Sequence, residues 1–124
     1  MASDIQYEIP TWNQIYDLLL TQSEKIQTYK PDLIVAIVRG GLIPARILTD
    51  LLETPQFDTI DVEFYLGINQ TKPEPELKQP LSASVRYKKI LLVDDIADTG
   101  KTLQLAKSHL QDKDPLEIKL ATLY

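Results

Sequence analysis

The chain has 124 residues, of which 44% are hydrophobic, and a net charge of −5 at pH 7, which fits one globular domain. It contains no cysteine and one histidine, which excludes disulfides, thiolate metal sites and sites built from several imidazoles. The negative charge argues against nucleic-acid binding, and the lack of a membrane-length apolar run or a secretory signal predicts a cytoplasmic protein without a membrane partner.

The first predicted element is a helix that begins at Thr11 and ends before Pro31. Thr11 and Gln14 have the spacing of a capping box. Short runs of branched apolar residues predict strands buried on both faces, and alternation of apolar and polar residues predicts a further strand. The remaining elements are, in order, a strand at Leu33–Val38, a helix at Leu42–Glu53, strands at Ile60–Leu66 and Ile90–Val93, a helix at Thr102–Leu110 and a strand at Ile118–Leu123.

One long segment, Gly67–Ser84, shows no periodicity. It is polar and contains Pro73, Pro75 and Pro80. A loop of this length in a compact domain is usually functional or disordered. We therefore predict a single domain over residues 1–124 with a flexible loop at about 67–84.

Strands that alternate with helices predict an α/β fold with a mainly parallel, twisted sheet flanked by helices. In such sheets, ligands bind beyond the carboxyl ends of the strands. Arg39-Gly40-Gly41 follows one predicted strand and Asp94–Thr102 follows another. We expect the two loops to line one crevice.

Thr99-Gly100-Lys101-Thr102 opens a predicted helix. Free N–H groups and the helix dipole favour an anion there, although an ordinary helix cap would have the same residues. A nucleotide-triphosphate P-loop is excluded because it needs a glycine five residues before Gly100, where the chain has Asp95.

The acidic residues of the same loop have two interpretations each. Asp94 and Asp95 can bind Mg²⁺ or accept hydrogen bonds from vicinal hydroxyls, or they can be a solvated pair. Asp98 can cap the next helix or act as a general base. Arg39-Gly40-Gly41 offers a cation and flexible amides that suit a second phosphate group, or it forms a tight turn into a helix.

Taken together, these segments resemble the type I phosphoribosyltransferases. Val93–Thr102 is similar to the binding signature of that family for phosphoribosyl pyrophosphate: a hydrophobic strand, an acidic pair, a short spacer and Thr-Gly-x-Thr. Val38–Gly41 is similar to the family's pyrophosphate loop. The resemblance covers about residues 30–124 and implies a phosphoribosyltransferase-type, Rossmann-like core.

The resemblance implies a role for each matching position. Asp94 and Asp95 would hold the ribose hydroxyls, directly or through Mg²⁺. Arg39 and the amides of Gly40 and Gly41 would hold the pyrophosphate, after a Val38–Arg39 peptide bond that is often cis in the family. The 5-phosphate would be held by the backbone and hydroxyls of the segment Ala97, Asp98, Thr99, Gly100, Lys101 and Thr102.

Asp98 indicates the acceptor base. Family members that act on 6-oxopurines carry an aspartate at this position, near N7 of the purine, where it exchanges its proton as N9 attacks. The resemblance thus implies an enzyme of purine salvage that transfers a phosphoribosyl group from phosphoribosyl pyrophosphate to guanine, xanthine or hypoxanthine. Asp98 and Arg39 would be catalytic, and Arg39 in place of lysine points to the xanthine–guanine branch.

The family also has features beyond the last predicted strand. Relatives carry a lysine that contacts the 6-oxo group and a hood segment with an aromatic residue that stacks on the base. The chain ends at Tyr124, so we expect the hood, and with it the base half of the site, to be missing. Because family members commonly form dimers, we also expect a homodimer.

Three other functions share parts of the pattern. A regulatory relative that binds RNA or nucleotides without turnover usually lacks an aspartate at the position of Asp98 and has a basic face. A phosphoribosyl pyrophosphate synthetase is built from two such domains, which 124 residues cannot supply. The third alternative is a domain that only binds ribose 5-phosphate or a nucleoside monophosphate as its effector. Only an assay distinguishes such a domain from a truncated enzyme.

Overall fold

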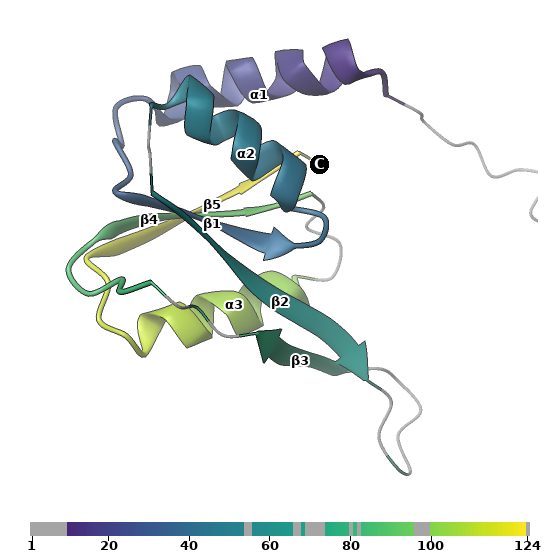
Figure 1. Ribbon diagram of the computed structural model, residues 1–124, viewed down its shortest axis with the longest axis vertical. Helices are drawn as coiled ribbons and strands as arrows, with labels where there is room; N and C mark the ends of the chain where they lie inside the picture. Colours follow the sequence, from purple (N-terminus) through teal and green to yellow (C-terminus); the bar gives the residue numbers. More distant parts are fainter. Residues whose placement is uncertain are drawn as a thin grey trace, which may run out of the picture.

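The computed structural model describes residues 10–53, 56–65, 68, 74–79, 81, 83–95 and 100–123. Its elements, shown in Figure 1, are α1 (Trp12–Ile26), β1 (Leu33–Val38), α2 (Leu42–Leu51), β2 (Phe57–Tyr65), β3 (Glu74–Gln79), β4 (Lys89–Asp94), α3 (Lys101–Gln111) and β5 (Glu117–Thr122). The predicted helices and strands are all confirmed, with shifted ends. Across the described residues, no helix has the length and apolar character needed to cross a membrane.

The strands form one sheet in the order β3-β2-β1-β4-β5. β1 pairs in parallel with β2 and β4, and β4 pairs in parallel with β5. β3 is antiparallel to β2 at one edge. The sheet is therefore mainly parallel, as the sequence predicts. Helices α1 and α2 cover one face of the sheet, and α3 lies on the other (Figure 1).

The two central strands are buried because helices cover both of their faces. Every residue of Leu33–Ile37 and of Ile90–Asp94 is buried. Alternate side chains enter two apolar clusters, one beneath α3 and one beneath α1 and α2. Since β1 and β4 are neighbours with the same direction, their carboxyl ends are fixed side by side at one edge of the sheet.

The prediction of an irregular loop over Gly67–Ser84 is wrong for residues 74–79, which form β3. Pro75 lies opposite Phe64 in this strand; an edge strand tolerates proline because one side of it needs no ladder hydrogen bond. The last β1–β2 pair is Val38 with Asp61, whereas β3 pairs with Asp61–Tyr65. The hairpin thus projects past the end of β1 (Figure 1). Residues 66, 67, 69–73, 80 and 82 of this region lie outside the described residues.

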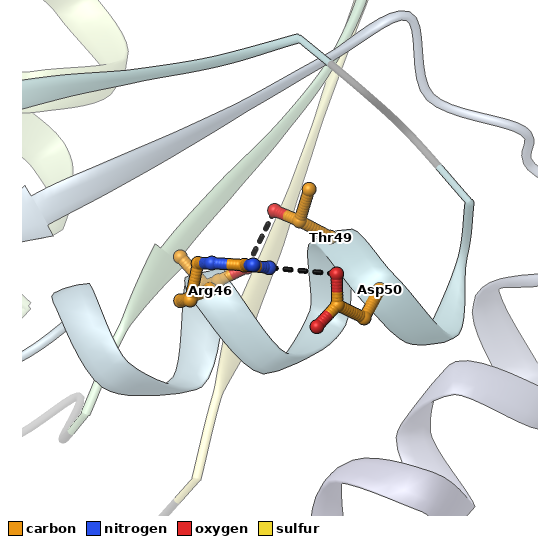
Figure 2. A network of polar contacts seen from close by, with 4 residues as sticks. Arg46, Thr49 and Asp50 are labelled. Atoms are coloured by element: carbon orange, nitrogen blue, oxygen red, sulfur yellow. Dashed lines mark hydrogen bonds and ion pairs between the residues drawn. The ribbon is translucent and has the colours of Figure 1, made fainter.

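Local hydrogen bonds define the helices that cover the first face. The capping box at the start of α1 is confirmed: the Gln14 N–H donates to Thr11 Oγ1 at 3.1 Å, and the Thr11 N–H donates to Gln14 Oε1 at 2.8 Å. On α2, Arg46 forms an exposed ion pair with Asp50 at 2.7 Å, and Thr49 Oγ1 donates to the Ala45 carbonyl at 2.8 Å (Figure 2). An exposed pair of this kind stabilises the helix little.

Candidate functional site

The two loops that the sequence predicts to meet do lie together at the carboxyl edge of the sheet. β1 leads into Arg39-Gly40-Gly41, and β4 ends in Asp94, followed by Asp95. A Cβ atom built on Gly40 would lie 2.5 Å from both Cγ and Oδ1 of Asp95. The Asp95 carboxylate therefore packs directly against the backbone of Gly40, and the two loops form one surface.

The loop after β1 is a tight turn. Its Val38–Arg39 peptide bond is cis, as the resemblance implies. The Gly41 N–H donates to the Ile37 carbonyl at 2.8 Å, and the Leu42 N–H donates to the Arg39 carbonyl at 3.1 Å. Arg39 is exposed at the tip, and α2 begins directly afterwards. The turn thus carries an exposed arginine and a helix N-terminus on either side of Gly40, the residue that packs against Asp95, a combination that suits an anion.

Gly41 is required by close packing. A Cβ atom there would overlap the carbonyl oxygen of Val93 and lie 2.8 Å from that of Ile37. These oxygens belong to the backbones of β4 and β1, which have no freedom to move away. Gly41 consequently lets the turn lie against the ends of both central strands.

Asp94 is the buried member of the acidic pair. Its side chain is 7% exposed, and its Oδ1 accepts the Asp95 N–H at 2.8 Å. Burial raises the pKa of Asp94 from 3.8 to about 6; the hydrogen bond from the Asp95 backbone opposes this, while the Asp95 carboxyl adds to it. Bringing a cation to the pair would favour the charged form of Asp94.

Asp95 is held through its backbone. Its N–H donates to Asp94, and its carbonyl accepts the Leu123 N–H at 3.1 Å. Its half-buried side chain reaches Gly40. The sequence did not reveal the contact with Leu123, because the two residues follow the ends of different strands and neither has an unusual residue type.

The second predicted anion site is the start of α3. Gly100 precedes the helix with φ 79°, and no atom lies within 4 Å of a Cβ built on it. Its conformation, and not a lack of space, favours glycine. Lys101 is exposed and Thr102 half-buried in the first turn. Ala97, Asp98 and Thr99 lie outside the described residues, so the roles of these three stay predictions.

His109 lies in the last turn of α3 and is not part of the two loops of the candidate site. It is half-buried on α3, and its Nε2 accepts the Leu81 N–H at 3.4 Å. Burial lowers the pKa of His109, and the nearby Lys113 lowers it further, while Asp112 opposes the change.

A groove of about 850 Å³ lies at the opposite end of the parallel strands, where β1, β2 and β4 begin. Its charged residues are two lysines and two carboxylates, so they give it no net charge: Lys30, Lys88, Asp32 and Glu53. The groove contains no residue of the two loops. It is separate from the candidate site.

Comparison with known proteins agrees with this geometry. Residues 11–124 match the family described as the phosphoribosyl transferase domain. Hypoxanthine-guanine phosphoribosyltransferase of Saccharomyces cerevisiae is 35% identical over 94% of this chain and 59% of its own length. Xanthine-guanine phosphoribosyltransferase of Gluconobacter oxydans is 34% identical over 86% of this chain and 64% of its own. The chain thus spans about three fifths of the length of these curated relatives.

A solved structure agrees as well. The purine phosphoribosyltransferase from Pyrococcus horikoshii superposes with a TM-score of 0.84 at 36% identity, covering 91% of this chain and 73% of its own. The matched residues include both loops of the candidate site. The chain belongs to the phosphoribosyl transferase domain family.

Proposed function

We propose that this chain binds phosphoribosyl pyrophosphate and transfers its phosphoribosyl group to a 6-oxopurine. The observation that carries the proposal is the packing of Gly40 against the Asp95 carboxylate. It brings a loop with a cation next to a loop with two carboxylates. Phosphoribosyl pyrophosphate has both matching parts, a pyrophosphate group and a sugar diol.

The described residues divide between these parts. Arg39 and the amide of Gly40 would bind the pyrophosphate, since a guanidinium donates paired hydrogen bonds to phosphate oxygens. The expected part of the Gly41 amide is not supported, because its N–H donates to the Ile37 carbonyl within the turn. Asp94 and Asp95 would accept hydrogen bonds from the ribose hydroxyls. The N-terminus of α3 would receive the 5-phosphate. The spacing of the two loops across neighbouring strands supports one ligand that extends over both.

The proposed reaction is a substitution at the anomeric carbon of the ribose. The bond from this carbon to the pyrophosphate oxygen breaks, and the purine N9 forms a bond to the carbon. Asp98, by resemblance, would take the proton that the purine loses. Arg39 would stabilise the negative charge that grows on the pyrophosphate, which is the kind of stabilisation that contributes most to catalysis.

The acidic pair fits Mg²⁺. This ion is held in proteins by one or two carboxylates, with water and substrate oxygens as its other ligands. The described part of the chain contains no cluster of three or more metal-binding side chains, so the pair would depend on the substrate to complete a site. When bound, Mg²⁺ would neutralise charge on the pyrophosphate.

The acceptor class follows from the relatives. The two curated relatives reported above are named for hypoxanthine and guanine or for xanthine and guanine, and these bases share a 6-oxo group. Asp98 agrees with that class by resemblance. A homodimer and a cytoplasmic location, expected from resemblance and composition, are part of the same proposal.

Calorimetric titration tests the proposal. Phosphoribosyl pyrophosphate with Mg²⁺ should bind the wild-type chain, and Arg39→Ala should weaken binding by about 10–100-fold, the usual effect of losing hydrogen bonds to a charged group. Arg46→Ala is the matched control, because Arg46 lies on the exposed face of α2 (Figure 2). A titration with guanosine monophosphate then tests the base half of the site.

The outcomes separate the alternatives. Binding of phosphoribosyl pyrophosphate alone would indicate a donor site without a complete base pocket. Guanosine monophosphate bound without any turnover of guanine and donor would favour a nucleotide-binding domain. If neither ligand binds the wild-type chain, the proposed function is wrong.

A further inference from the structure

Gln22 is a polar residue on the apolar side of α1. Its helical neighbours Ile15, Leu19 and Ile26 belong to the cluster beneath α1 and α2. Gln22 itself is half-buried, and its Nε2 donates a hydrogen bond to the backbone carbonyl of Thr122. Thr122 is the last residue of β5. The bond joins residues a hundred positions apart, so it links the first helix to the last strand.

Thr122 needs such a donor because β5 is an edge strand. Among the described strands it pairs only with β4, up to Asp94 opposite Thr122. Backbone groups on the outer side of an edge strand have no ladder partner. Gln22 supplies one at the last residue of the strand, where an unsupported end would fray.

The same peptide group reaches the candidate site on its other side. The carbonyl of Thr122 and the N–H of Leu123 belong to one planar peptide unit and point in opposite directions. The carbonyl accepts from Gln22, and the N–H donates to the Asp95 carbonyl at 3.1 Å. The two hydrogen bonds hold this unit from both sides, so it connects Gln22 with Asp95 directly.

Asp95 in turn depends on this contact for its position. Its N–H is bound to Asp94, and its carboxylate packs against Gly40. The hydrogen bond from Leu123 fixes the third group of the residue, its carbonyl. Loss of that bond would release the carbonyl of Asp95 and so loosen the orientation of its carboxylate.

We propose that Gln22 is a positioning residue for the site that binds phosphoribosyl pyrophosphate: by holding the Thr122–Leu123 peptide, it fixes Asp95 against Gly40. The inference rests on the proposed function, because it takes Asp95 as a ligand-binding group. Helix α1 contributes no residue to the site, but under this proposal it affects the affinity for phosphoribosyl pyrophosphate.

Gln22→Met tests this inference, because methionine has nearly the length and packing of glutamine but no hydrogen-bond donor. Gln22→Glu, which keeps the shape and cannot donate when ionised, is the second variant. Gln27→Met is the matched control, an exposed glutamine at the end of the same helix. Each variant is measured for affinity towards phosphoribosyl pyrophosphate with Mg²⁺, for hydrogen exchange of the Leu123 amide, and for melting temperature.

We expect both Gln22 variants to weaken donor binding by about 3–10-fold and to speed exchange at Leu123 by a similar factor, the size of one lost neutral hydrogen bond. Gln27→Met should change neither. A lower melting temperature with unchanged donor affinity would show that Gln22 only ties α1 to the sheet, and would overturn the inference. Failure of the wild-type chain to bind the donor would instead overturn the proposed function, and this role with it.

Discussion

Gly40 leaves no room for a side chain, because the carboxylate of Asp95 occupies the place of its Cβ atom. Gly41 is equally confined, but by the backbone carbonyls of Val93 and Ile37. Among the described glycines, only Gly100 has a positive φ. The two glycines of the turn are therefore required by space alone, and they differ in whether the neighbouring atoms can move.

This difference predicts that alanine at Gly40 mainly lowers ligand affinity, whereas alanine at Gly41 mainly lowers stability. In Gly40→Ala the Asp95 side chain can rotate away, so the unfolding free energy should change by less than about 1 kcal/mol, while affinity for phosphoribosyl pyrophosphate with Mg²⁺ should fall about 10-fold or more. In Gly41→Ala the strand backbones cannot move away, so the unfolding free energy should fall by about 1–3 kcal/mol. Urea unfolding and calorimetry measure the two quantities.

Gly100→Ala is the control for backbone strain, since Gly100 has φ 79° and open space around it. This substitution should lower the free energy of unfolding, but its added methyl group would not overlap with the acidic pair. Equal donor affinity in Gly40→Ala and the wild type would contradict the role given to the Gly40–Asp95 contact.

At the scale of elements, helix α3 and the segment after β3 are joined by His109. The Leu81 N–H donates to its Nε2, and two residues later the Ala83 N–H donates to the Asp58 carboxylate at 2.7 Å. Leu81 and Val85 are buried in the cluster beneath α3. The segment that leads from β3 to β4 is thus held by one side chain from α3 and one from β2.

The His109 contact should weaken in acid. Its pKa is lowered below the ordinary 6.5 in the folded chain, so the unfolded chain takes up the proton more readily, and this contribution to stability is lost as pH falls from above 6.5. Protonation also replaces the acceptor with a donor. The protection of the Leu81 amide against hydrogen exchange should therefore fall by about 2–10-fold between pH 7.5 and 5.5, the equivalent of one neutral hydrogen bond.

His109→Gln keeps an acceptor that does not titrate, and should remove this pH dependence. The Ala83 amide, held by Asp58, is the internal reference. The charged groups that act on His109 are Asp112 and Lys113, which directly follow α3. Protection of Leu81 that is independent of pH in the wild type would contradict the prediction.

Sequence patterns predict the elements that bury apolar residues on a regular period. β1 is a continuous apolar run, β4 contains the apolar run Ile90–Val93, and α1 begins at a capping box formed by Thr11 and Gln14. β3 was missed because its residues are polar and include Pro75. What makes it a strand is pairing with β2, a contact across the chain that local propensity does not contain.

The candidate site, too, could be predicted from the sequence only in part. Arg39, Gly40, Asp94 and Asp95 follow from the rule that ligands bind beyond the carboxyl ends of parallel strands. The packing of Gly40 on Asp95 and the bonds that fix Asp95 through Leu123 do not follow from it. They arise from tertiary contacts between ordinary residue types, which local sequence patterns do not contain.

At the scale of the whole molecule, an acidic chain is proposed to bind an anionic ligand. The net charge is −5 at pH 7, and the acidic pair lies in the site itself. Long-range attraction therefore does not favour the ligand, and affinity must come from local groups: Arg39, the backbone amides and Mg²⁺ at the carboxylates.

The buried carboxyl of Asp94 should make the stability of the ligand-free protein depend on pH. Its pKa is raised from 3.8 to about 6 in the folded chain. Between these values the folded state holds a proton that the unfolded state has released, so the unfolding free energy falls as pH rises through this window. Since one pKa unit corresponds to about 1.4 kcal/mol, the loss amounts to up to about 3 kcal/mol above pH 6.

Asp94→Asn should remove this loss, because asparagine stays neutral and can still accept the Asp95 N–H. Urea unfolding should find the variant close to the wild type near pH 4 and more stable by about 1–3 kcal/mol at pH 7.5. Added Mg²⁺ should narrow the gap at pH 7.5, since a cation at the pair stabilises only the charged wild-type site. Asp50→Asn, on the exposed face of α2 (Figure 2), controls for the loss of a carboxylate. Identical pH profiles for Asp94→Asn and the wild type would contradict the buried, proton-holding state of Asp94 and with it the need for a cation at this edge of the sheet.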